Sequence, residues 1–484
     1  MKYLIYICFF LIIFGSIFLS IKYFTHLKKD IIFKLLSRKL LQIQGYFGQE
    51  IFFSSYGLEA LIKSNVHNII LNQSTEKAFI YLEQKKYFYE VAILKAFINP
   101  CNSVEYFEKA IQKCPKNYLL FAELAKLYLI NKQFDYAERI IEKIDIKKAN
   151  IYTKAVIHYI QSVIATSAGD LLWASKEASS ALKLFKKKQA YFEVATTYLH
   201  IGTIYRISAV SDVAQCMFEA AKEIFMKMKI DILQAISLAN LGMLTAGQNR
   251  YEEAEGYFSQ ALELNQKINN ICGKAEILNQ QALMETTREN YGEAKKLVSK
   301  AKNLHRKIKN DIGEALSWDI LSYINLGQKE YSQLINSTQK AIVIYEKNQN
   351  ISALYEMKYM QASAYFNLQN LSQAEEILRQ IINNANEHNS CFHIANAYNL
   401  LGLIFLKKNN LQKAKAFFQQ AVQLEEKNNR LNGAAVDYAN LALIEQKCGN
   451  KEQAQKILEM AFKYAQDYGD ENLIKQIQEQ LIVF

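Results

Sequence analysis

Proline is almost missing from this sequence: only Pro100 and Pro115 occur in 484 residues. Glycine is also sparse, at 17 residues, and no stretch rich in serine or glycine separates one part of the chain from another. Low proline disfavours disordered linkers and most all-β designs. Half of the residues are apolar and 22% are charged. These proportions predict one continuous helical body.

Motifs for catalysis or cofactor binding are missing as well. The sequence has no HExxH, no CxxC pair, no Walker-type Gly-Lys-Ser/Thr and no glycine-rich phosphate loop. His388, Cys391 and His393 could supply three metal ligands, but a fourth is not evident, and the alternative is that they belong to a linker between repeats. We therefore expect no enzyme, no cofactor, no metal and no small-molecule substrate. Basic and aromatic residues do not alternate on one face, so we expect no nucleic-acid partner.

Cysteines are few and have no close pair. Their number, 7, is odd, and they are scattered from Cys8 to Cys448. Scattered, unpaired thiols are typical of a reducing compartment.

Alanine returns every forty residues along most of the chain. The positions are Ala174, Ala214, Ala254, Ala294, Ala374, Ala414 and Ala454, with Leu334 in the remaining slot. Four residues later there is usually Phe, Leu or Val, and seven residues later another alanine. A fixed period of about 20–50 residues indicates a stacked-repeat architecture.

One repeat contains two stretches of apolar residues at helical spacing. The first lies between Gln234 and Thr245 and the second between Tyr251 and Leu264, with turn residues at 247–249. This pattern predicts two antiparallel helices in each repeat. A single hairpin cannot bury both faces, so each hairpin must stack on the next.

These residues resemble the tetratricopeptide repeat, in a long form of forty residues. The best matches are Ile201-Gly202-Tyr205-Ala214-Phe218-Ala221 and Leu401-Gly402-Phe405-Ala414-Phe418-Ala421. The resemblance covers roughly residues 84–470 and implies an all-α fold, a right-handed superhelical solenoid of helix hairpins. Residues 471–484 are expected to form a capping helix, with Leu473, Ile477 and Leu481 on one face.

The resemblance also implies a concave groove lined by the first helix of each hairpin. Side-chain amides suit an extended peptide, since each offers a donor and an acceptor, and aromatic side chains add apolar anchors. The predicted groove residues are Asn240, Asn279, Tyr323, Tyr359, Phe366, Asn396, Asn399 and Asn440. No cationic clamp for a terminal carboxylate is present at the matching positions, so a chaperone tail is not the expected ligand.

The N-terminus carries the longest apolar run. Residues 3–21 are uncharged and could cross a bilayer as a helix; a cleaved secretory signal is the alternative. We expect a transmembrane signal-anchor at 1–21, followed by a basic juxtamembrane and helical lead-in at 22–83. The first forty residues hold seven Lys/Arg and one acid. Basic residues after a span favour a cytoplasmic body.

The sequence therefore predicts a single-pass membrane protein, in a bacterial inner membrane, with its repeats in the cytoplasm. Its expected function is that of a membrane-tethered scaffold or adaptor that binds a protein or peptide partner in the groove. The alternative is the same fold facing the periplasm and assisting export or assembly of envelope proteins.

Overall fold

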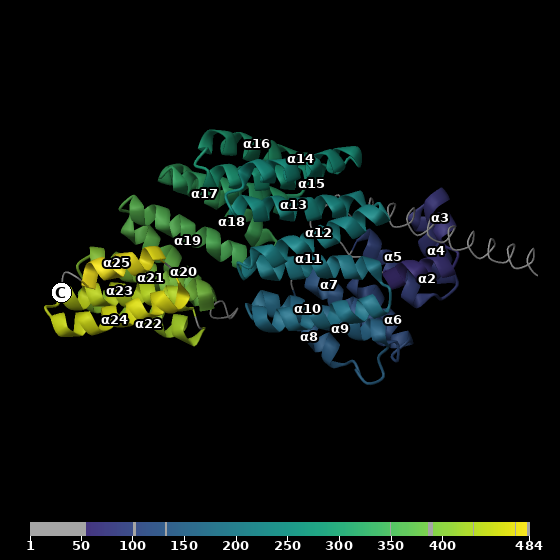
Figure 1. The fold of residues 1–484 in the computed structure, drawn as a ribbon, viewed down its shortest axis with the longest axis horizontal. Coiled ribbons are helices and arrows are strands. Elements are labelled where there is room, and N and C mark those ends of the chain that lie inside the picture. The colour runs from purple at the N-terminus through teal and green to yellow at the C-terminus, as the bar shows by residue number, and fades with distance from the viewer. Residues whose placement is uncertain are drawn as a thin grey trace, which may run out of the picture. The chain divides into compact units, whose positions relative to one another are not determined.

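In the computed structural model, every regular element of the described residues is a helix, and none is a strand. The structure describes residues 55–99, 103–130, 133–348, 350–385, 391–428, 430–469 and 471–481. The chain divides into two compact units: an N-terminal unit that ends at Met284 and a C-terminal unit that begins at Glu285. Figure 1 shows the helices of both units in chain order.

The helices of the N-terminal unit are α2 (Ser55–Lys63), α3 (His67–Asn72), α4 (Thr75–Gln84), α5 (Phe88–Ile98), α6 (Val104–Lys113), α7 (Tyr118–Ile130), α8 (Phe134–Glu142), α9 (Ile151–Ala168), α10 (Leu171–Lys187), α11 (Tyr191–Ile207), α12 (Ser211–Met228), α13 (Asp231–Gly247), α14 (Tyr251–Lys267) and α15 (Ile271–Thr287), whose last residues pass into the next unit. Those of the C-terminal unit are α16 (Tyr291–Lys307), α17 (Asp311–Gly327), α18 (Tyr331–Lys347), α19 (Ile351–Asn367), α20 (Leu371–Ala385), α21 (Cys391–Lys407), α22 (Leu411–Lys427), α23 (Leu431–Lys447), α24 (Lys451–Tyr468) and α25 (Glu471–Leu481).

Consecutive helices pack as hairpins within each unit. In the N-terminal unit α11 pairs with α12 and α13 with α14; in the C-terminal unit α17 pairs with α18, α21 with α22 and α23 with α24 (Figure 1). Each hairpin also packs on the next, as α12 does on α13 and α22 on α23. The predicted all-α solenoid of helix hairpins is confirmed.

The packing between the two helices of a hairpin, which we call the hairpin seam, explains why alanine recurs every forty residues. Ala254 and Ala261 on α14 are fully buried, and so is Phe258 between them. The ring of Phe258, rather than Ala254, covers Gly242 of α13: a Cβ at Gly242 would lie 2.7 Å from Cε1 of Phe258. Phe218 over Gly202 and Phe418 over Gly402 repeat this contact. In these three hairpins the glycine of the first helix makes room for a phenylalanine ring of the second helix.

The turns show a shorter period than the sequence suggests. The helices from α13 to α18 each have 17 residues and are joined by three-residue turns. The middle residue of every described turn in this stretch is left-handed, for example Asn249 (φ 60°) and Asn269 (φ 54°). Backbone N–H groups close the end of α13, from Asn249 to the carbonyl of Ala246 (3.0 Å) and from Arg250 to that of Thr245 (2.9 Å).

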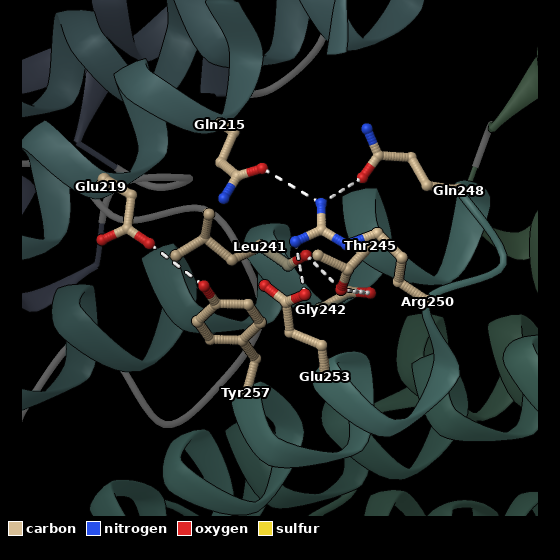
Figure 2. Close-up of polar contacts among 9 residues, drawn as sticks. All are labelled: Gln215, Glu219, Leu241, Gly242, Thr245, Gln248, Arg250, Glu253 and Tyr257. Carbon is tan, nitrogen blue, oxygen red and sulfur yellow. Dashed lines mark hydrogen bonds and ion pairs between the residues drawn. The ribbon is translucent and has the colours of Figure 1, made fainter. Parts of the chain in front are cut away.

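Polar side chains link neighbouring hairpins on their second helices (Figure 2). Tyr257 on α14 donates a hydrogen bond to Oε1 of Glu219 on α12 (3.1 Å). Arg250, just before α14, donates to Oε1 of Gln215 on α12 (3.4 Å) and pairs with Glu253. The exposed pairs of Arg250 contribute only about 0–1 kcal/mol each, so burial of apolar residues stabilises the stack more than they do.

The last helix, α25, packs against α24. Ile477 is buried, and Leu473 and Leu481 are partly buried against the same cluster, which includes Leu458 and Ala461 of α24. The apolar face of α25 consists of the three residues that the sequence predicted for it.

Two predictions from the sequence are wrong: the transmembrane helix in the predicted fold class and the single-pass membrane localisation. Within the described ranges, no helix has both the length and the apolar character needed to cross a bilayer. The helices there bury their apolar residues against neighbouring helices and carry polar residues on their other faces; α9, with 18 residues, contains Lys154, His158 and Gln161. The expected span at residues 3–21 lies outside the described residues.

Candidate partner-binding groove

The first helices of successive hairpins lie directly against each other. In the N-terminal unit α9 contacts α11, and in the C-terminal unit α17 contacts α19 and α19 contacts α21. The second helices of these hairpins are not joined by comparable contacts. The first helices therefore form one side of each stack, which we call the inner face.

All eight predicted groove residues lie on first helices. Asn240 is on α13, Asn279 on α15, Tyr323 on α17, Tyr359 and Phe366 on α19, Asn396 and Asn399 on α21, and Asn440 on α23. Asn240 and Asn279 belong to the N-terminal unit and the other six to the C-terminal unit.

The inner face of the N-terminal unit is hollowed between α11, α13 and α15. The cavity has a volume of about 410 Å³. Its polar lining includes Arg206 on α11, Asn240 on α13, and Glu276 and Gln280 on α15. Asn265 on α14 and Asn270 in the following turn also line it, and Met243 adds an apolar wall. Of the eight amide and aromatic residues above, only Asn240 lines this cavity.

Two polar atoms in the cavity wall are buried with no hydrogen-bond partner among the described residues: Nε of Arg206 and Oε1 of Gln280. Arg206 also forms no ion pair with a carboxylate in this part of the chain. Burying such a group without a partner costs about 1–3 kcal/mol, and more for a charged one. A ligand that offers an acceptor to Arg206 and a donor to Gln280 would remove this cost.

Neither residue was predicted from the sequence, although one signal was available for Arg206. Arg206 occupies the same repeat position as Phe366, four periods earlier, and Phe366 was predicted to lie in the groove. The position was therefore identified in one repeat and overlooked in another.

Glu276 adds a carboxyl group to the same cavity. Sγ of Cys272 donates a weak hydrogen bond to its Oε1 (3.6 Å). Burial raises the pKa of Glu276 to about 7. Near neutral pH this carboxyl is therefore protonated in part of the molecules, and in that form it can itself donate a hydrogen bond.

The two amides of the N-terminal unit differ in accessibility. Asn240 is half-buried, and its Nδ2 donates to the carbonyl of Ile236 on its own helix (3.0 Å). Asn279 is 6% exposed and belongs to the packed interior of α15 more than to an open surface.

The inner face of the C-terminal unit is acidic and aromatic. Tyr323 is 41% exposed, and its hydroxyl donates to Oε1 of Glu356 (3.3 Å). Tyr345 donates to Oδ2 of Asp319 (2.5 Å), and Asn399 donates to Oδ1 of Asp437. Burial raises the pKa of both Asp319 and Asp437 to about 7.

The remaining predicted residues of this unit are half-buried. Burial raises the pKa of Tyr359, and Nζ of Lys407 lies 4.7 Å from the ring centroid of Phe366. Asn396 and Asn440 are partly exposed.

The polar cluster weighed as a metal site is only partly described. His388 lies outside the described residues, and of the three only the His393 side chain is placed. His393 is 7% exposed, and its ring meets that of Tyr355 edge-on, with centroids 5.8 Å apart. His393 is thus a packed residue of α21.

Family models for the tetratricopeptide repeat match residues 235–271, 355–388 and 395–428. The chain contains tetratricopeptide repeats. The three matches correspond to the hairpins that begin with α13, α19 and α21. The coarse resemblance seen in the sequence is therefore confirmed, and a scaffold built from such repeats fits a role in protein interactions. No curated protein matches the sequence.

Solved structures with similar folds are distant in sequence. Yeast Tom70 shares 14% identity over 88% of this chain and 96% of its own, with a TM-score of 0.49. A Rap protein complexed with competence and sporulation factor shares 15% identity over 68% and 96%, with a TM-score of 0.47. A signal transduction ATPase with numerous domains from Pyrococcus horikoshii, which has a tetratricopeptide repeat sensor, shares 16% identity over 91% of this chain and 65% of its own, with a TM-score of 0.47. Similarity at this level does not transfer the partners of those proteins to this chain.

Proposed function

We propose that this protein is a non-catalytic scaffold whose inner face binds an extended segment of a partner protein. The main contact is the cavity between α11, α13 and α15 in the N-terminal unit. The amide and aromatic side chains of the inner face in the C-terminal unit offer further contacts of the same kind.

The observation that carries this proposal is the pair of unsatisfied atoms, Nε of Arg206 and Oε1 of Gln280, in the wall of one cavity. One is a donor and the other is an acceptor. An extended peptide presents a carbonyl and an N–H at every residue, so it can satisfy both atoms at once. A ligand with acceptors alone would leave Gln280 unsatisfied.

Other residues of the cavity suit the same ligand. Asn240 uses its Nδ2 within α13, which leaves its carbonyl oxygen to accept a hydrogen bond. Met243 and Ile236 supply apolar surface beside these polar groups. A few placed polar groups on an apolar wall are typical of ligand cavities.

The test is a pair of substitutions, Arg206→Leu with Gln280→Leu, compared with the wild type. Removing two unsatisfied polar groups is expected to leave thermal stability unchanged or raised, while capture of the partner falls. The control carries Glu376→Gln and Lys456→Gln, two exposed positions on α20 and α24. Crosslinking pull-down identifies the partner from the wild type, and titration calorimetry compares the three proteins.

We expect the affinity of the Leu variant to fall by roughly tenfold or more, because two hydrogen bonds are lost at about 0.5–1.5 kcal/mol each or more where a charge takes part. Equal affinity of the wild type and a well-folded Leu variant would contradict the proposal. Helical content is checked by circular dichroism in all three.

A further inference from the structure

Helix α16 is the most basic helix of the C-terminal unit. Its 17 residues, Tyr291–Lys307, contain six lysines and arginines and one glutamate. Two of these cations, Lys302 and Arg306, are one turn apart and so lie on the same face of the helix. That face meets α17.

Three cationic side chains lie around the ring of Trp318 on α17. Nζ of Lys302 lies 3.7 Å from the centroid of its ring, and Nζ of Lys340, which comes from α18, lies 4.7 Å from it. The guanidinium carbon of Arg306 is 5.8 Å away. Three positive side chains from two second helices thus surround one indole ring.

Among the described residues, only one of the three cations forms an ion pair with a carboxylate. Arg306 pairs with Glu314 (2.7 Å), and the same carboxylate accepts from Nε1 of Trp318 (3.2 Å). Farther along α16, Lys295 pairs with Glu330 (2.8 Å). Lys302 and Lys340 contact no carboxylate in the part of the chain that the structure describes.

Lys302 and Lys340 therefore repel each other, and the nearby carboxylate of Glu314, which is paired with Arg306, offsets this repulsion only in part. Lys302 is half-buried, so water screens this repulsion incompletely. Burial, together with the charges of Arg306 and Lys340, lowers the pKa of Lys302. The ring of Trp318 offsets part of the repulsion, but an anionic partner would offset much more.

We propose that Lys302 and Lys340, held on Trp318, form a docking site for an acidic segment of a partner protein. We call it the Trp318 basic site. Its lysines come from the second helices α16 and α18 and its tryptophan from the first helix α17, whereas the inner-face cavity belongs to the N-terminal unit. The two lysines each take a carboxylate from neighbouring Asp or Glu residues of the segment.

Two features favour a protein segment over a nucleic acid. Trp318 is only 8% exposed, so its ring offers no open face on which a base could stack. Val343, one turn from Lys340 on α18, is 57% exposed and provides an apolar contact beside the charges. Acidic residues mixed with apolar ones fit this surface.

Trp318 itself reports binding. The chain has two tryptophans, and the other, Trp173, is 39% exposed on α10. Trp173→Phe therefore leaves Trp318 as the only tryptophan. Titration of this full-length variant with octaglutamate is expected to change its fluorescence, with a dissociation constant that increases with salt. Octaglutamine is expected to cause no change.

In the same background, Lys302→Gln with Lys340→Gln is expected to weaken octaglutamate binding roughly tenfold, from two charge contacts of up to about 1 kcal/mol each. The matched control is Lys456→Gln with Lys463→Gln, two exposed lysines of α24, which should bind as the parent does. Octaglutamate that causes no change in fluorescence and no heat in calorimetry would overturn the proposal. So would binding that survives the loss of Lys302 and Lys340.

Two further arms test the other polyanions. Oligo-dT of twenty nucleotides and phosphatidylserine vesicles are titrated under the same salt conditions. Tighter binding of either one at this site, lost in the Lys302/Lys340 variant, would replace the acidic protein segment by a nucleic acid or a membrane surface and overturn the proposal as stated.

Discussion

A substitution at Gly242 tests how closely the two helices of a hairpin pack. A methyl group at this position would lie 2.7 Å from the ring of Phe258, which is fully buried and cannot move away easily. We expect Gly242→Ala to lower the free energy of unfolding by about 1–3 kcal/mol, the usual cost of overpacking. Thermal and urea unfolding followed by circular dichroism measure the change.

A matched control lies on the partner helix. Gly256, on α14, has no atom within 4 Å of the position that a Cβ would take. Gly256→Ala should therefore stabilise the protein by about 0.5–1 kcal/mol, because alanine is the better helix former. If both substitutions changed stability in the same direction, the assigned contact between Gly242 and Phe258 would be wrong.

Glu276 makes the stability of the N-terminal unit depend on pH. Burial raises its pKa from 4.5 to about 7, so the folded state binds the proton more tightly than the unfolded state. Its contribution is fully present below pH 4.5 and is lost as the pH rises through 7. Relative to the wild type, Glu276→Gln should gain stability between pH 5 and pH 8, by roughly 2–3 kcal/mol at most.

Unfolding of both proteins at the two pH values measures this effect. Asp319 and Asp437, which also have raised pKa values, are unchanged by the substitution and cancel in the comparison. A stability difference that is the same at pH 5 and pH 8 would show that Glu276 stays ionised in the fold.

At the scale of the helix and its turn, the structure reveals a unit half as long as the sequence repeat. The turn within a hairpin, at Asn249, and the turn between hairpins, at Asn269, share the same left-handed residue. Glu289, Lys309 and Lys329 continue the series at twenty-residue intervals. Glutamate and lysine are not typical turn residues, so the twenty-residue period of the turns is not visible in the sequence. The sequence shows only the forty-residue period.

Three positions of this twenty-residue series carry a glycine: Gly169, Gly449 and Gly469. Gly449 has a φ of 84°, while the equivalent Ala209 has a φ of 58°. A left-handed conformation costs a residue with a Cβ about 1–2 kcal/mol. We therefore expect Gly449→Ala to destabilise its hairpin by about 1 kcal/mol, and Ala209→Gly to be neutral or slightly stabilising. Chemical denaturation distinguishes the two signs; a neutral Gly449→Ala would contradict the left-handed assignment.

The sequence predicts the elements well and the site poorly, for physical reasons. Ala254 and Phe258 recur because every hairpin needs the same seam, so packing leaves a periodic signal. For Gln280 there is no such signal, and for Arg206 the period shows only its repeat position. That their polar atoms are buried without a partner depends on neighbouring helices, which the sequence does not show. The apolar run at 3–21 illustrates the opposite case: hydropathy alone predicted a membrane span that no described helix supports.

The whole molecule should respond to damage locally, because each repeat contacts mainly its neighbours. Hydrogen exchange followed by mass spectrometry tests this with Gly242→Ala. Faster exchange is expected in α11 to α15, while α21 to α24, in the other unit, keep their wild-type rates. A uniform increase along the chain would mean that the protein unfolds as one cooperative body.

Site-specific photocrosslinking is the most direct test of the central claim, that a partner segment binds in the cavity of the N-terminal unit. A benzophenone amino acid replaces Met243, which lines the cavity, and in a control protein it replaces Met460, which is 43% exposed on α24. The partner should crosslink at position 243 and not at position 460, and Arg206→Leu with Gln280→Leu should abolish the crosslink. Crosslinking at position 460 alone, or an unchanged crosslink at 243 in the Leu variant, would contradict the claim.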